Sequence, residues 1–238
     1  LDTARKDASQ RGLLGVSIFV ISPTEEGLPL ASNLVDVLYA ESPASSLSEN
    51  SDWFRTVRPL GKMLLGERTC VKPMPEEADD WTHPYHGPDN NPQSTDGIAK
   101  APYRTHFLTG PYYVPFPTVT VVSGGRLFKA MGNVGYKERE HEWVETLAVF
   151  NAYNGTLLWR RNLQPGFNIH RNTMIATRDV LYLADNNSCK ILDAATGELL
   201  DEIVAPEDAS GPVWKWMALS DGVLYALVGE PEFQDVSL

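Results

Sequence analysis

Two histidines and two aspartates lie close together in the stretch "DDWTHPYH". Imidazole and carboxylate side chains are ligands for metal ions, and a further histidine follows later in the chain. Pro84 separates the two nearby histidines and prevents a regular helix from presenting both on one face. Because this combination is common in polar loops that bind no metal, no metal site is expected. The residues considered are Asp79, Asp80, His83, His86 and His106.

The sequence contains no recognisable set of a nucleophile with its base. Its serines concentrate in polar contexts such as "SPASSLSENS", and the chain has no G-x-S-x-G motif. Cys70 and Cys189 are far apart and share no motif, which argues against a cysteine-rich zinc site, and no C-x-x-C-H haem motif occurs. No catalytic residue is therefore predicted.

Composition restricts the classes of partner. The chain has 238 residues, of which 42% are hydrophobic, and a formal net charge of −11. Such a charge repels phosphate backbones, so no nucleic-acid partner is expected. No run approaches the roughly 20 apolar residues that a transmembrane helix needs, so no membrane span is expected. The compartment, periplasm or cytoplasm, stays open.

The elements that would position a site come from an internal repeat. "FNAYNGTLLW" and "LDAATGELLD" share an apolar run, a turn ending in Gly155 or Gly197, and a second apolar run. Short β-rich segments separated by turn residues surround both copies. The first repeat contains "TVTVV", "RLFKAM", "TLAVFNA" and "TLLWRRNL", with a charged insert after its second strand. The second contains "TMIATR", "DVLYLAD", "SCKILDA" and "GELLDEIV", and the third only "VWKWMALS" and "VLYALVG".

Four antiparallel strands per repeat, arranged radially, describe a β-propeller blade. "FNAYNGTLLW" resembles the outer-strand signature of PQQ-like (quinoprotein-type) propeller repeats, and "LDAATGELLD" matches it in part. Asp201 stands where that signature has Trp, so Trp159 is expected between neighbouring blades and Asp201 at the surface. The repeat does not by itself imply the quinone, and PQQ is not expected as a cofactor.

The resemblance also indicates where a ligand would meet the propeller. Inner strands begin at the axial channel, which makes His170, Arg171, Trp214 and Trp216 the candidate ligand-binding residues. The alternative is that these aromatic rings pack against the next blade. Upstream, "DDWTHPYHGPDNNPQS" and "PYRTHFLTGP" look like the lead-in that precedes the first full blade in such proteins.

The first part of the chain differs from the repeats in its predicted secondary structure, because helices alternate with strands. Residues 2–15 have helical composition and end in Gly, a second helix begins at Ser51 or Asp52, and strands are expected over 15–22, 33–42 and 61–67. This alternation predicts an α/β sheet buried on both faces. "EEGLPLASNLVDVLYAES" and "FRTVRPLGKMLLGE", in this order, resemble the second half of a class I S-adenosylmethionine (SAM)-dependent methyltransferase of Rossmann-like fold.

That resemblance implies SAM as the cofactor of a full-length parent. Glu41 and Ser42, at the carboxyl end of a strand, are the residues that would contact SAM. The family's glycine-rich loop is absent from these residues, so no measurable SAM affinity is expected of residues 1–238. The alternative is a docking layer without activity.

The predicted fold class is therefore α/β followed by all-β. The expected domains are a methyltransferase-like segment (1–72), a linker and long loop (73–117) and an incomplete ring of PQQ-like blades (118–238). The predicted function is binding or scaffolding within a larger multidomain protein, as this chain does not look catalytic. The alternatives are SAM-dependent methyltransfer in the parent and PQQ-dependent oxidoreduction. Expected partners are the remaining blades, another protein, or a second copy.

Overall fold

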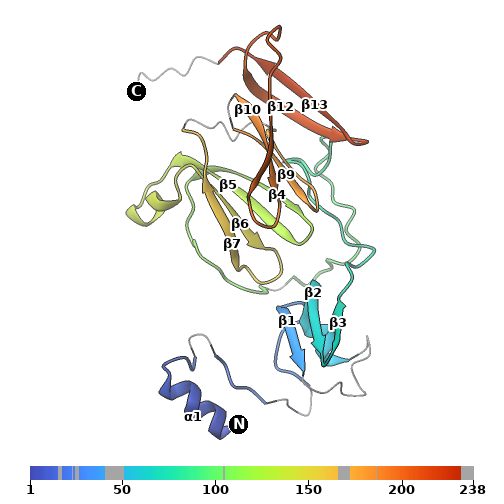
Figure 1. Cartoon of the computed structure of the whole chain (residues 1–238), viewed down its shortest axis with the longest axis vertical. Helices are drawn as coiled ribbons and strands as arrows, with labels where there is room; N and C mark the ends of the chain where they lie inside the picture. Colours follow the sequence, from blue (N-terminus) through green and yellow to red (C-terminus); the bar gives the residue numbers. More distant parts are fainter. Residues whose placement is uncertain are drawn as a thin grey trace. The chain divides into compact units, whose positions relative to one another are not determined.

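The computed structural model describes residues 1–15, 18–22, 24, 27–40, 51–103, 105–165, 172–185 and 187–231. It divides into two compact units, Leu1–Pro75 and Glu76–Leu238, whose strands can be followed in Figure 1. None of the helices in the described residues is long and apolar enough to cross a membrane. The three domain ranges expected from the sequence stay a prediction.

The first unit contains two helices and one three-stranded sheet. β1 pairs in parallel with β2, and β2 pairs antiparallel with β3, in the order β1-β2-β3. A parallel pair agrees with the predicted α/β character of this segment, whereas the Rossmann-like and methyltransferase-like assignments remain predictions. The elements are α1 (Asp2–Gln10), β1 (Val35–Ala40), α2 (Asp52–Thr56), β2 (Val57–Leu65) and β3 (Arg68–Val71).

A buried lysine organises the junction between α2 and β2. Ser51 caps the helix by accepting a hydrogen bond from the backbone N–H of Phe54. At the other end, Lys72 Nζ donates to the carbonyl oxygens of Phe54 and Val57 at 2.9 and 2.7 Å, and to Asn33 Oδ1 at 2.8 Å. A cation at a helix C-terminus satisfies carbonyls that have no partner within the helix. Burial lowers the pKa of this lysine.

Two expectations for this unit are wrong. Residues 18–22 form no strand, and Ile18 makes only an isolated bridge to Leu14; within the expected range 15–22, Val16 and Ser17 lie outside the described residues. The sheet is also not buried on both faces, because Val37 and Tyr39 are 52% and 67% exposed. Apolar strand residues predict burial only where another element covers them.

The second unit contains two four-stranded antiparallel sheets and one hairpin, each with its strands in sequence order. All ten strands predicted from the repeat are present, and the charged insert forms the 3-10 helix η1 (Glu138–Trp143). The first sheet contains β4 (Phe116–Ser123), β5 (Arg126–Val134), β6 (Thr146–Asn151) and β7 (Leu157–Asn162). The second contains β8 (Met174–Ala176), β9 (Val180–Ala184), β10 (Ser188–Asp193) and β11 (Leu199–Val204), and the hairpin, called the third sheet here, contains β12 (Val213–Ser220) and β13 (Val223–Gly229).

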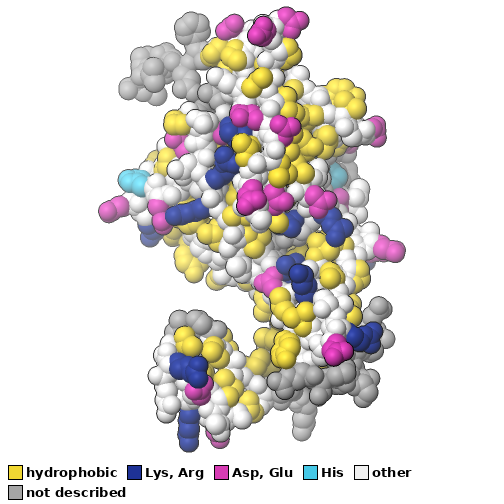
Figure 2. Space-filling model, viewed as in Figure 1, with side chains coloured by type: hydrophobic (Ala, Val, Ile, Leu, Met, Phe, Trp, Pro, Cys, Tyr) yellow, Lys and Arg dark blue, Asp and Glu magenta, His cyan; other side chains and the backbone are white. Residues whose placement is uncertain are grey.

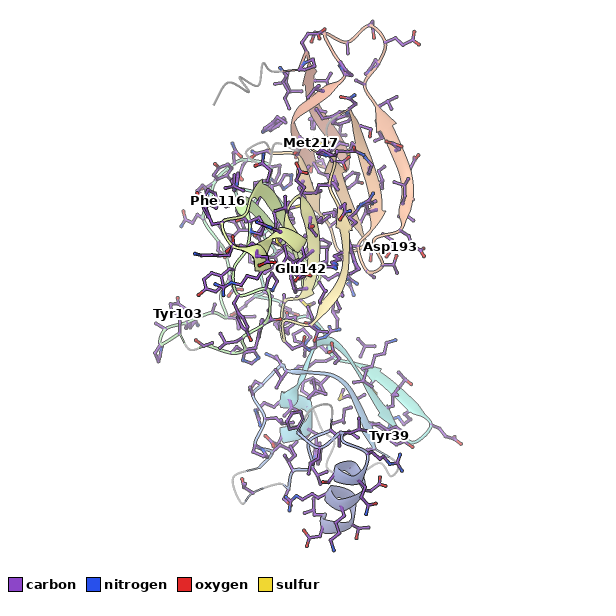
Figure 3. All side chains as sticks on the ribbon, turned by 90° about the vertical axis from the view of Figure 1, so that its left-hand side faces the viewer. Tyr39, Tyr103, Phe116, Glu142, Asp193 and Met217 are labelled. Atoms are coloured by element: carbon purple, nitrogen blue, oxygen red, sulfur yellow. The ribbon has the colours of Figure 1, made fainter. Side chains whose placement is uncertain are left out.

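The sheets pack face to face in sequence order. One core cluster joins the first and second sheets and includes Phe128, Leu147 and Leu183. Another joins the second and third sheets and includes Ile175 and Met217 (Figure 3). The first strand of each sheet lies against the first strand of the next, β4 against β8 and β8 against β12. Successive antiparallel sheets with adjacent first strands are the arrangement of propeller blades.

An aromatic ring explains why the repeated turn ends in glycine. Gly155 and Gly197 have φ of +73° and +77°, which favours glycine, and neither has room for a side chain. A Cβ on Gly197 would lie 2.7 Å from the ring of Trp159 in the preceding sheet. A Cβ on Gly155 would lie 2.6 Å from the ring of Phe107, in the segment before β4. Phe107 therefore packs on the glycine turn of the first sheet, as Trp159 packs on the glycine turn of the second.

Trp159→Ala is predicted to lower the free energy of unfolding by about 3 kcal/mol, as large-to-small aromatic changes in cores do. The side chain is partly buried against the first core cluster, and Nε1 donates to the Ala194 carbonyl oxygen at 3.2 Å. Asp201, its counterpart in the second repeat, is exposed as expected, so Asp201→Ala serves as the control with little effect. Urea denaturation measures both; equal, small losses would contradict the alignment of the repeats.

Candidate functional site

One segment, residues 79–86, called the bridging segment, joins the innermost strands of all three sheets. The carbonyl oxygen of Trp81 accepts from Val122 N on β4 at 2.7 Å, and that of Thr82 accepts from Ala176 N on β8 at 2.9 Å. His83 Nε2 accepts from Leu219 N on β12 at 3.1 Å. Three successive residues thus bind three sheets, at the inner edges where the sequence predicted an axial channel.

These contacts determine the tautomer of His83. Because Nε2 accepts a hydrogen bond from a backbone N–H, the ring proton must lie on Nδ1. Nδ1 is 2.8 Å from the Thr82 hydroxyl, which in turn donates to the carbonyl oxygen of His86 at 3.2 Å. Burial lowers the pKa of His83; Asp89 opposes this effect and His86 adds to it. The neutral imidazole is therefore a structural acceptor in this arrangement.

The other polar groups considered as metal ligands also make protein contacts. His86 Nε2 lies 2.8 Å from Asp79 Oδ2, and Asp80 Oδ2 accepts from the Ser123 hydroxyl at 2.7 Å. Burial alone would raise the pKa of Asp79, but hydrogen bonds from Thr95, Ser94 and His86 lower it. No group of three or more His, Cys, Asp or Glu suited to a metal ion occurs in the described residues.

We expect His83 to make the stability of the second unit pH-dependent. Its pKa is lowered from the usual 6.5, so the unfolded chain takes up a proton at a higher pH than the folded chain. The free energy of unfolding is predicted to fall as the pH drops below about 6.5, by at most about 1.4 kcal/mol per pH unit from this group. Denaturation between about pH 7.5 and about pH 5 measures the slope.

His83→Gln is predicted to remove that part of the slope, since the amide oxygen still accepts a hydrogen bond but does not titrate in this range. His106→Gln, at an exposed position before β4, is the control and keeps the slope. An unchanged slope in His83→Gln would contradict the role assigned to the buried imidazole.

Of the predicted ligand-binding residues, the structure describes Trp214 and Trp216. His170, Arg171, Glu41 and Ser42 lie outside the described residues. Trp214 is 4% exposed and packs in the core between the second and third sheets. Its indole N–H has no hydrogen-bond partner among the described residues. Ligand binding by this set stays a prediction.

Trp216 lies on the opposite face of β12 from Trp214. The pairing of β12 with β13 shifts between these two residues, so Trp214 pairs with Val228 and Trp216 with Leu227. Val228 packs into the core, whereas Leu227 belongs to a surface called the outer face. Val223, Tyr225 and Leu227 are 50%, 54% and 58% exposed there. The outer face consists of the exposed side chains of Val223, Tyr225 and Leu227 and the half-buried ring of Trp216.

Hydrophobic side chains are visible in Figure 2 over the strands near the C-terminal end of the chain. Within the described residues, β13 pairs only with β12, so its other edge has no neighbouring strand. Tyr225 and Leu227 were not among the residues predicted from the sequence to bind a ligand. The signal was available, because "VLYALVG" is apolar at both odd and even positions, which is typical of a strand covered on both faces.

The described side chains also argue against thiol chemistry at one of the two cysteines. Cys189 is fully buried between the second and third sheets, and burial raises the pKa of its thiol to about 12. A thiol with such a pKa is a poor nucleophile near neutral pH. Cys189 therefore serves packing.

Comparison with known proteins leaves the chain without an assigned family. No family model and no curated protein matches it. Among solved structures, it is similar to the quinohemoprotein alcohol dehydrogenase ADHIIG from Pseudomonas putida HK5, at 12% identity and a TM-score of 0.41, over 61% of this chain and 22% of that chain. The quinohemoprotein alcohol dehydrogenase from Comamonas testosteroni gives 13% and 0.32, over 47% and 16%. The matched part is thus less than a quarter of either structure.

Proposed function

We propose that the chain is a binding or scaffolding module built on PQQ-like propeller repeats, and that its outer face docks a further β-sheet. The occupant is a sheet of the same kind, supplied by other repeats of a parent chain or by another protein. The observation that carries this proposal is the exposed apolar outer face beside the open edge of β13.

The molecule itself indicates what covers such a face. The first sheet is covered on one side by the second, and the second by the third, each time through apolar side chains. The outer face repeats this pattern with Trp216, Tyr225 and Leu227 but has no sheet on it in the described residues. Exposed apolar surface next to an unpaired strand edge favours association with another sheet.

Neither enzymatic alternative is favoured by a specific observation in the described residues. SAM binding would depend on Glu41 and Ser42, which are not described, and stays a prediction for a longer parent. PQQ-dependent oxidoreduction would need a ligand site at the inner edges of the sheets. There the bridging segment already uses the backbone N–H groups of Val122, Ala176 and Leu219.

The 238-residue chain is predicted to self-associate, with an apparent mass that rises with concentration, because a second copy is the available partner for the outer face. Leu227→Asp is predicted to shift the chain toward monomer. Leu108→Asp replaces a leucine that is exposed before β4 and is the matched control, with no effect on mass. Size exclusion coupled to light scattering gives the mass, and circular dichroism confirms that each variant is folded. A monodisperse wild-type monomer at all concentrations would contradict the proposal.

A further inference from the structure

A cavity of about 330 Å³ lies in the second unit, between the first sheet and the segment that precedes β4. This side of the sheet is opposite the first core cluster. Its floor is formed by side chains of β5 and β6, and its wall by residues 107–114. Pockets of roughly 300 Å³ and above are large enough for small organic ligands. The main apolar side chains around it are Phe107, Tyr112, Val114, Leu127 and Phe150.

Among the described residues, one charged side chain lines this apolar cavity. Lys129 lies on β5 between Phe128 and Ala130, which both point into the first core cluster, so Lys129 points to the other face. No described residue forms a hydrogen bond or an ion pair with its ammonium group. Burial lowers the pKa of Lys129, and no neighbouring charge contributes to the shift. The folded chain thus keeps a partly desolvated cation without a counter-ion.

The two other buried or half-buried lysines with known contacts behave differently. Lys72 donates to several backbone and side-chain oxygens, and Lys190 forms an ion pair with Asp185. A buried cation normally has such partners, because its desolvation is costly. Lys129 is half-buried and has no such partner among the described residues, and an anion in the cavity would supply one.

We propose that this cavity binds a small organic carboxylate, whose apolar body packs against Phe107, Leu127 and Phe150 while its carboxylate pairs with Lys129 Nζ. The apolar lining provides the area for the body, and the single cation determines the sign of the head group. This inference does not depend on the proposed docking function, because the cavity is formed by the first sheet and the outer face by the third.

A second hollow shares the wall formed by residues 110–112 and extends the aromatic surface. In it Arg139 lies over the ring of Tyr113, at 4.0 Å from the ring centroid, and Trp143 lies on η1. Glu142 is the acidic residue of this hollow, and it accepts a hydrogen bond from Trp143 Nε1. The positive charge of Arg139 favours the approach of an anion in a chain whose net charge is −11.

The test uses 4-phenylbutyrate and its neutral amide as probes, with isothermal titration calorimetry on the full chain. The wild-type chain is expected to bind the acid at least about tenfold more tightly than the amide, as a charge-assisted hydrogen bond contributes. Lys129→Met keeps the length of the side chain and removes its charge. It is expected to abolish this preference while leaving the affinity for the amide within about twofold.

Two further variants keep the result interpretable. Lys100→Met removes a positive charge at an exposed position outside the cavity and is expected to leave both affinities unchanged. Ala152→Phe places a large side chain at the cavity lining and is expected to weaken both probes. The inference is overturned if the acid does not bind at millimolar concentration, if acid and amide bind equally, or if Lys129→Met retains the preference.

Discussion

Three hydrogen bonds, accepted by three consecutive residues, connect the sheets of the second unit at its inner edge. Trp81, Thr82 and His83 accept from β4, β8 and β12, which belong to three different sheets. Face-to-face packing of apolar side chains is non-directional and leaves neighbouring sheets free to slide. Directional bonds from one short segment determine the offset of each sheet relative to the next. They also satisfy N–H groups on strand edges that would otherwise be open to pairing with other molecules.

At the outer edge, aromatic rings connect each sheet to the element that precedes it. Trp159 packs on the Gly197 turn of the next sheet, and Phe107 packs on the Gly155 turn. A ring can approach the backbone this closely only where no Cβ intervenes, so each glycine meets a conformational and a steric requirement together. The glycine that the two repeated stretches share therefore has a physical basis, since both turns receive a ring from the preceding element.

Much of the second unit could be predicted from its sequence because its signals are local. Strands such as β9 and β10 are short apolar runs bounded by turn residues, and both were predicted. The bridging segment could not be predicted, because its bonds join His83 to Leu219 across 136 positions. Nor could the opposite orientations of Trp214 and Trp216, which depend on an irregular pairing between them. In the first unit, local pattern was misleading for residues 18–22, which pair with no strand in the described part of the unit.

The first and third sheets lie at the two ends of the stack, and their apolar end faces are covered to different extents. Each end sheet has one face that no further sheet covers in the described residues. At the first sheet, residues 107–114 cover that face incompletely and leave a cavity containing one cation, Lys129. At the third sheet the face is open, and Tyr225 and Leu227 provide no charge. We expect a partly open cavity with one charge to select a small anion, and an open apolar face beside a free strand edge to select another sheet. The two proposed kinds of binding thus follow from the different covering of the two end sheets.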